Sequence, residues 1–150
     1  SVEIVPGITS GIAASSYVGI PLTHRHGASS VTFVTGHETS EKQEKSVNWR
    51  QLALSSNSLV IYMGIRNIEY IVEELIIGGM KRDTKCAAIQ EATLKNQKSL
   101  IIELSKLPEA IKENNIKPPA IVIIGRIVDF QVKNTITKLS TVNLPKIKKI

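Results

Sequence analysis

The chain has 150 residues and a mass of 16.4 kDa, which is the size of one domain with a sizeable core. Hydrophobic residues make up 42% and charged residues 21% of the chain, a composition that excludes disorder along its whole length. The longest apolar runs, at 58–63 and 120–124, are far shorter than the about 20 residues of a membrane span. The single cysteine, Cys86, excludes a disulfide scaffold and a cysteine-clustered zinc site.

The formal net charge of +6 is concentrated near the end of the chain. Residues 129–150 hold five lysines against one aspartate, so the other 128 residues carry a net charge of only +2. A basic tail can bind nucleic acid, but no aromatic side chains interleave these lysines as stacking platforms would. We therefore divide the chain into a domain at 1–128 and a basic tail at 129–150, interpret the tail as a solvated end, and expect no nucleic-acid partner.

The start of the chain bears on its location. No basic start followed by an apolar stretch is visible, so we expect no secretory signal. Because the sequence begins at Ser1 rather than Met, we expect a fragment or a processed product. We expect a cytoplasmic protein with no membrane partner, with a plastid as the alternative compartment.

Helical and strand patterns alternate in the first half of the chain. After the turn at Pro6-Gly7, Ser10 can cap a helix that continues to about Val18. Residues 29–35 alternate like a strand, residues 36–46 are polar and predict a loop, and residues 48–54 predict a short helix. The apolar run 59–63 is typical of a buried strand.

The second half begins with the clearest helix, in which apolar residues at 68, 71, 72, 75 and 76 share one face. Asn67 is expected to cap this helix, and Gly78-Gly79 to end it. Residues 85–90 and 97–102 predict a hairpin, residues 104–114 a helix, and residues 120–124 a last strand after Pro118-Pro119. The hairpin and the helical crossovers together predict an α/β domain with a mixed sheet.

Motifs that would name a reaction are absent: the sequence has no GxxxxGK[ST], GxGxxG, HExxH, EF-hand or GxSxG pattern. At the start of the helix expected at 10–18, free backbone N–H groups and the hydroxyls of Thr9 and Ser10 suit a small polar or anionic ligand. A plain helix cap is the alternative for this segment. Met63 follows a buried strand, where ligands collect in open α/β sheets, although a methionine there is usually part of the core. Cys86 is interpreted as a small buried hydrophobic residue.

The segment His24-Arg25-His26 is the densest polar cluster. Arg25 offers a planar fork of donors that suits a carboxylate. A solvated loop is the alternative. A metal site would need a third ligand beside the two histidines, for which His37-Glu38 is the only nearby candidate, and we expect no metal.

Several segments occur in a characteristic order and spacing: VPGITS at 5–10, YVGIPLTHR at 17–25, SVTFVTGH at 30–37, LVIYMG at 59–64 and PPAIVIIG at 118–125, with Trp49, Leu52-Ala53, Glu91-Ala92-Thr93 and Gln97-Lys98 between them. Over roughly residues 2–128, this series resembles the C-terminal half of the uroporphyrinogen-III C-methyltransferases, within the tetrapyrrole methylase family. The resemblance implies a homodimer that binds S-adenosyl-L-methionine in a cleft between two α/β domains. It also implies the transfer of two methyl groups to ring carbons of uroporphyrinogen III, giving precorrin-2 for sirohaem and cobalamin.

The resemblance implies roles for five residues. Thr9, Ser10, Met63 and Ala92 would contact the cofactor, with Ala92 lying against the adenosyl part by its backbone. Met63 would also face the substrate, and Arg25 would hold a substrate carboxylate. The resemblance leaves the catalytic base unidentified.

The chain departs from the family pattern in several places. The family's N-terminal domain, with its glycine-rich loop and GDP loop, has no counterpart, and Lys98 replaces the usual arginine. A family glycine is also missing, because Ile102-Glu103 stands in its place. We therefore expect the isolated chain to be inactive without a partner half.

Three alternatives stay open. One is a methylase of the same fold that acts on a later corrinoid intermediate, although PLTHR and TGH argue against it. The second is a stand-alone binding module whose basic tail holds nucleic acid. The third is a non-catalytic relic that only folds and dimerises.

Overall fold

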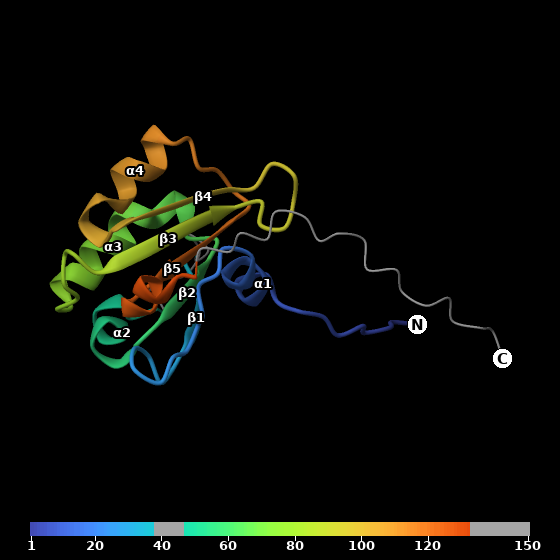
Figure 1. The fold of residues 1–150 in the computed structure, drawn as a ribbon, viewed down its shortest axis with the longest axis horizontal. Coiled ribbons are helices and arrows are strands. Elements are labelled where there is room, and N and C mark those ends of the chain that lie inside the picture. The colour runs from blue at the N-terminus through green and yellow to red at the C-terminus, as the bar shows by residue number, and fades with distance from the viewer. Residues whose placement is uncertain (38–46, 133–150) are drawn as a thin grey trace.

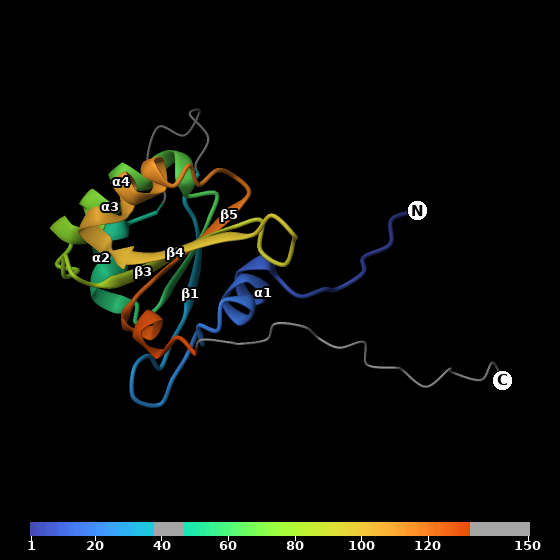
Figure 2. The same ribbon diagram turned by 45° about the horizontal axis from the view of Figure 1, so that its top comes forward.

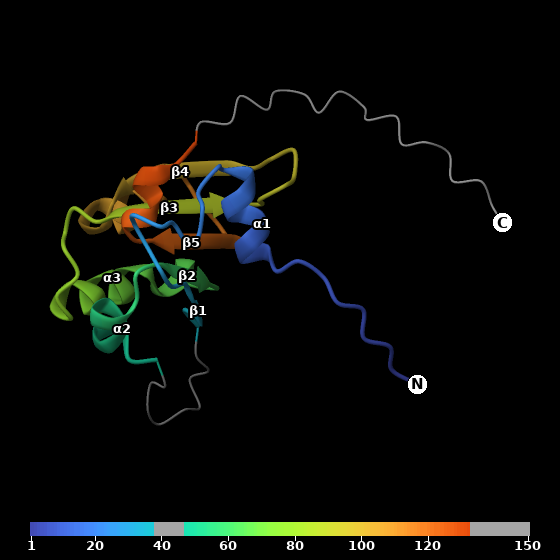
Figure 3. The ribbon, with the colours of Figure 1, turned by 60° about the horizontal axis from the view of Figure 1, so that its bottom comes forward.

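A single mixed β-sheet organises residues 1–37 and 47–132, the part of the chain that the computed structural model describes (Figure 1). The strand order is β1-β2-β5-β3-β4, and Figure 3 shows the strands side by side in that order. The strands are β1 (Thr32–Thr35), β2 (Leu59–Tyr62), β3 (Lys85–Gln90), β4 (Lys98–Glu103) and β5 (Ala120–Ile124). The predicted α/β class with a mixed sheet is confirmed.

The direction of each strand follows from its connection. β1 and β2, joined through α2 (Trp49–Ser55), are parallel neighbours, and β3 and β4 form the predicted antiparallel hairpin. β5 lies between β2 and β3 and runs antiparallel to both. The crossover through α3 (Ile68–Ile77) therefore joins two parallel strands that are not neighbours. The periodicity of the sequence could not predict that β5 inserts between β2 and β3, because tertiary packing decides which strands become neighbours.

Helices cover the two faces of the sheet unequally (Figure 2). On one face, α2, α3 and α4 (Leu107–Glu113) pack over side chains such as Leu59 and Ile61. On the other face, α1 (Ser10–Tyr17) and the last 3₁₀ turn (Arg126–Phe130) pack over side chains such as Val60 and Ile123. Successive strand residues point to opposite faces, which is why one apolar run can serve two cores.

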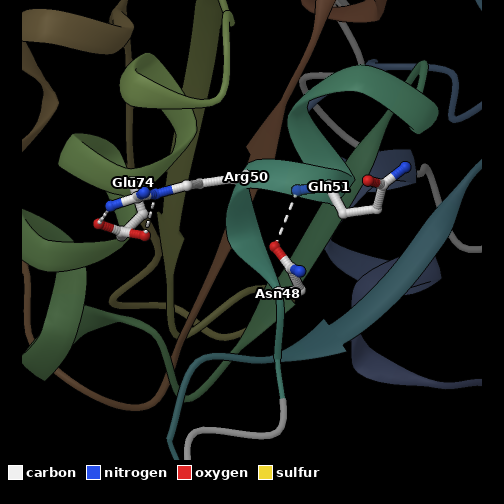
Figure 4. A network of polar contacts seen from close by, with 4 residues as sticks. All are labelled: Asn48, Arg50, Gln51 and Glu74. Atoms are coloured by element: carbon white, nitrogen blue, oxygen red, sulfur yellow. Dashed lines mark hydrogen bonds and ion pairs between the residues drawn. The ribbon is translucent and has the colours of Figure 1, made fainter.

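Polar contacts fix α2 at both its start and its flank (Figure 4). At its start, Asn48 accepts a hydrogen bond from the Gln51 N–H at 3.0 Å, so the side chain caps the helix. Along its flank, Arg50 donates two hydrogen bonds to Glu74 of α3, at 2.8 and 3.0 Å. This contact with Glu74 raises the pKa of the Arg50 guanidinium, chiefly through the hydrogen bond and then through charge.

Several predicted boundaries shift in the structure. α1 begins at Ser10 with Thr9 in the cap position, one residue before the cap that the sequence predicts. The predicted helix at 104–114 begins as a 3₁₀ turn (Leu104–Lys106) before α4. Asn67 precedes α3 but does not cap it, because its carboxamide donates to the Gly36 carbonyl at 2.8 Å instead.

The domain makes contacts up to the last described residue. The Gln131 carboxamide donates to the Val18 carbonyl at 2.8 Å, and the Val132 N–H donates to the Gly19 carbonyl at 2.8 Å. These contacts lie on the tail side of the boundary that we place after residue 128. Most of the predicted tail, residues 133–150, lies outside the described residues. Within the described part, no helix is both long and apolar enough to span a bilayer.

Candidate functional site

The carboxyl ends of β1, β2 and β3 lie at one edge of the sheet, because β1 and β2 are parallel and β5 opposes both β2 and β3. We call this the carboxyl edge, and it consists of the chain that follows these strands at 36–37, 63–64 and 91–93. Figure 3 shows α1 lying across the sheet near the arrowhead of β3. Ligands collect at such edges in open α/β sheets.

The start of α1 is tied to this edge by Tyr62, the last residue of β2. The Tyr62 hydroxyl lies 2.5 Å from Thr9 Oγ1 and accepts a hydrogen bond from the Gly11 N–H at 3.1 Å. Gly11 has no room for a Cβ, because that atom would overlap the Tyr62 hydroxyl and Val60. The Thr9 hydroxyl is thus held by Tyr62 and does not cap its own helix.

This arrangement leaves donor groups at the helix start. Within the described residues, the Ser10 N–H has no hydrogen-bond acceptor, and Thr9 and Ser10 are both exposed. An unpaired N–H group and a hydroxyl at a helix start suit a polar ligand. Thr9 occupies the cap position of α1, but its side chain makes no cap hydrogen bond.

Met63 is directed out of the core. Its backbone has φ 52°, and 63% of the residue is exposed. A positive φ is uncommon for a residue other than glycine, and such strain tends to be held at ligand sites. The alternative of Met63 as a core residue is therefore wrong.

The loops that follow β1 and β2 touch each other through their backbones. Gly36 cannot carry a Cβ, because that atom would overlap the Gly64 Cα. The Gly36 N–H donates to the Tyr62 carbonyl at 2.7 Å, while its carbonyl accepts from Asn67. Asn67 thereby fixes the loop beside Met63, a role that its sequence position did not reveal.

Ala92 lies beyond β3, in a second strained loop. Its neighbours Glu91 and Thr93 have φ values of 48° and 74°. Ala92 is half-buried and packs on the α1 side of the sheet, as Tyr62 does. Because only β5 separates β2 from β3, the ends of these strands are two strand spacings apart, about 10 Å. The structure therefore brings Thr9, Ser10, Met63 and Ala92 to one edge.

Arg25 lies at the opposite edge of the sheet. Its loop leads back to the start of β1 and is closed by His24, whose N–H donates to the Ala28 carbonyl at 2.8 Å. The ring of His24 stacks on Phe130, with centroids 4.1 Å apart. β1, whose four residues span about 13 Å, runs from the side of this loop to the carboxyl edge. Arg25 is exposed and makes no ion pair with any described residue.

Metal-ligating and nucleophilic side chains are sparse. The rings of His24 and His26 lie 5.6 Å apart, and no group of three His, Cys, Asp or Glu in residues 1–37 and 47–132 could hold a metal ion. Cys86 is fully buried, and this burial raises the pKa of its thiol. The interpretation of Cys86 as a small core residue is confirmed.

Like Asn67, Tyr62 has a role at the carboxyl edge that the sequence did not reveal. It lies inside the segment Tyr62-Met63-Gly64, yet the sequence alone did not predict a role for its hydroxyl. Strand alternation could have indicated one, because it places Tyr62 on the same face as Val60, toward α1. A tyrosine that ends a buried strand needs a partner for its hydroxyl.

The fold is an α/β domain whose carboxyl edge gathers four of the five predicted site residues, Thr9, Ser10, Met63 and Ala92. The model of the tetrapyrrole (corrin/porphyrin) methylases matches residues 1–108, and the chain belongs to this family. The predicted resemblance is thereby confirmed.

Individual relatives make the comparison more specific. The chain is 45% identical over 129 residues to a uroporphyrinogen-III C-methyltransferase of Synechocystis sp., covering 86% of this chain and 49% of the relative. It is 40% identical over 126 residues to an S-adenosyl-L-methionine-dependent uroporphyrinogen III methyltransferase of Methanosarcina barkeri, covering 84% and 49%. The chain thus spans about half the length of the curated relatives it matches.

A solved structure matches a similar share of this chain and is also matched over about half of its own length. A uroporphyrin-III C-methyltransferase from Thermus thermophilus in complex with S-adenosylhomocysteine superposes with a TM-score of 0.70 at 28% identity. The match covers 85% of this chain and 53% of that one.

Proposed function

We propose that the chain is the C-terminal half of a methyltransferase that converts uroporphyrinogen III to precorrin-2, for sirohaem or cobalamin, with S-adenosylmethionine as methyl donor. The observation that carries this proposal is the carboxyl edge, where a family-matched segment holds Thr9 against Tyr62 beside the exposed Met63. The names of the relatives at 40–45% identity support the substrate and the cofactor.

The residues at the carboxyl edge fit the cofactor. The Thr9 hydroxyl and the Ser10 N–H offer polar contacts, Met63 offers an apolar surface, and Ala92 offers backbone groups. When bound, the cofactor would supply a sulfonium methyl group: an electron-rich pyrrole carbon would bond to the methyl carbon as the sulfur–methyl bond breaks, and the neutral thioether S-adenosylhomocysteine would leave. The chain's own task is to align the reactants and exclude water. We leave the proton acceptor unassigned.

Arg25 is proposed to hold a carboxylate of the substrate. Its guanidinium is exposed and has no acidic partner among the described residues, so it can form a bidentate contact. Because Arg25 lies at the opposite edge of the sheet from Thr9 and Met63, this contact is proposed to anchor the periphery of the substrate and not the reacting carbon. An arginine there would also favour the approach of an anionic substrate.

A partner half is proposed to complete the site. The chain spans half of its relatives' length, and its first residues expose the apolar side chains of Val2, Ile4, Val5 and Ile8. Exposed apolar side chains that gather in one segment are typical of an interaction surface. We therefore propose that the isolated chain is inactive, and that the complete enzyme works as a cytoplasmic homodimer, with a plastid as the alternative compartment.

Calorimetric titration with S-adenosylhomocysteine tests the proposal. The chain is titrated alone and together with the N-terminal half of a related enzyme, using the wild type and the variants Thr9→Val and Arg25→Ala. We expect binding only in the mixture, weakened about tenfold by Thr9→Val and unchanged by Arg25→Ala. Arg25→Ala should instead raise the KM for uroporphyrinogen III. If the mixture of folded halves binds no ligand, the proposed function is wrong.

A further inference from the structure

The loop between β3 and β4, residues 91–97, has a costly backbone conformation and little packing. Glu91 and Thr93 both have positive φ, and Thr93 is β-branched, which makes φ 74° a marked outlier. Leu94 is 61% exposed, so its side chain contributes little to holding the loop. Specific hydrogen bonds must therefore stabilise this conformation.

Backbone hydrogen bonds anchor the two ends of this loop. At the start, the Glu91 N–H donates to the Pro119 carbonyl at 3.0 Å, and the Leu94 N–H donates back to the Glu91 carbonyl at 3.1 Å. At the end, the Gln97 N–H donates to the Leu94 carbonyl at 3.1 Å. The middle is held differently: the Thr93 N–H donates to the side-chain oxygen Oε1 of Gln97 at 2.8 Å. Within the described residues, Gln97 is the side chain that hydrogen-bonds the backbone of this loop.

We propose that Gln97 is a positioning residue for the cofactor, an inference that rests on the proposed function. The Thr93 N–H belongs to the peptide group that follows Ala92, so the Gln97 carboxamide fixes this group. The peptide group before Ala92 is held by the Leu94 N–H, which donates to the Glu91 carbonyl. The Ala92 N–H donates to no acceptor among the described residues, so it stays available to a ligand. The methyl side chain of Ala92 can neither donate nor accept a hydrogen bond, so any polar contact to the adenosyl part depends on how this backbone is held.

The inference depends on an acceptor at position 97. Gln97→Met keeps the length of the side chain but removes the acceptor, whereas Gln97→Glu keeps an oxygen in the same place. Gln131→Met is the matched control, because the Gln131 carboxamide also bonds a backbone group at 2.8 Å, but at the opposite edge of the sheet. Each variant is titrated with S-adenosylhomocysteine in the mixture with the N-terminal half of a related enzyme.

We expect Gln97→Met to weaken binding five- to tenfold, with Gln97→Glu within about twofold of wild type and Gln131→Met unchanged. In the isolated chain, hydrogen exchange at the Thr93 amide should become at least about tenfold faster in Gln97→Met. The melting temperatures of the variants show whether affinity changes independently of stability. If Gln97→Met does not fold, Gln97→Asn, which withdraws the acceptor by one methylene, replaces it with the same expectation.

The outcomes separate this inference from the proposed function. If the wild-type mixture binds no S-adenosylhomocysteine, the proposed function fails, and the positioning role fails with it. If the wild type binds and Gln97→Met binds equally well, only the positioning role is overturned. Unchanged exchange at the Thr93 amide in Gln97→Met would also overturn it, because the hydrogen bond would then not hold the loop.

Discussion

The face of the sheet under α2, α3 and α4 is closed by large aliphatic side chains, whereas α1 covers only part of the opposite face. Leu75 and Leu107 are fully buried under the three helices. On the other face, α1 contributes the small buried residue Ala14, while Ile12 and Tyr17 remain exposed. Large buried side chains supply most of the hydrophobic stabilisation, so we expect the stability of the fold to depend chiefly on the face with three helices.

The composition of α1 follows from its position. Gly11 lies against Tyr62 and Val60 so closely that no side chain fits between them. The buried residues of α1 are glycine, alanine and serine, which contribute little buried area but let the helix backbone lie next to a strand end. The face under α1 therefore gains less stability from buried apolar area, but the backbone of α1 lies closer to the sheet. This arrangement suits the proposed role of the face in binding a ligand and a partner.

A pair of alanine variants tests this comparison most directly. Leu75→Ala should destabilise the chain by about 3 kcal/mol, because it leaves a cavity among fully buried side chains. Ile12→Ala, at a position 43% exposed on α1, should change the free energy of unfolding by less than about 0.5 kcal/mol. Urea unfolding followed by circular dichroism gives both values.

Equal losses in the two variants would contradict the comparison, since the α1 face would then contribute as much stability as the other. Ile12→Ala also serves as a control for partner binding. If the partner half covers this face, the variant should weaken association of the halves without changing the unfolding of the isolated chain.

The sequence predicted most of the fold because periodicity reports local structure. The apolar pattern of α3 and the alternation of the hairpin are set by residues close together in the chain. What it could not predict depends on contacts across the fold. The insertion of β5 between β2 and β3 is one case. Asn67 is another, because a carbonyl 31 residues away competes with its own helix for its carboxamide.

The sequence predicted the place of some site residues and not of others, for the same reason. Thr9, Met63 and Ala92 follow or precede regular elements, and the rule for strand ends places such residues at one edge. Arg25 belongs to a loop whose place is fixed by the stacking of His24 on Phe130, more than a hundred residues later in the chain. No local pattern reports such a contact, so the sequence did not reveal that Arg25 lies at the other edge.

A smaller effect is expected from Tyr62→Phe, which tests whether the start of α1 is tied to the sheet through one hydroxyl. The change removes the contacts with Thr9 Oγ1 and the Gly11 N–H. We expect a loss of about 1 kcal/mol in the free energy of unfolding, because the partly buried Gly11 N–H loses its acceptor.

The same variant should weaken binding of S-adenosylhomocysteine by the mixed halves, since the Thr9 hydroxyl is no longer held. Tyr17→Phe is the matched control, because this exposed tyrosine lies on the same helix. Calorimetry and urea unfolding of both variants give the comparison. If Tyr62→Phe behaves like Tyr17→Phe in both measurements, the hydroxyl contact does not hold α1.

The smallest effect is expected from Lys106→Met, on the surface of the face with three helices. Lys106 lies 2.8 Å from Glu103, and its hydrogen bond and charge, with a smaller contribution from Lys85, lower the pKa of the Glu103 carboxyl. A carboxyl with a lowered pKa in the folded chain adds stability above its unfolded pKa, and this stability is lost as the pH falls. Lys106→Met should therefore lower the melting temperature slightly at pH 7 in low salt. The difference should vanish well below pH 4.3, where the carboxyl is protonated, and in 0.5 M salt, where exposed charges are screened.

A Lys95→Met variant, on the exposed loop between β3 and β4, controls for the general loss of a positive charge. If Lys106→Met lowers the melting temperature equally at pH 7 and pH 3, the aliphatic part of the Lys106 side chain acts by packing and not by charge. The surface of the face with three helices would then contribute more to stability than we expect.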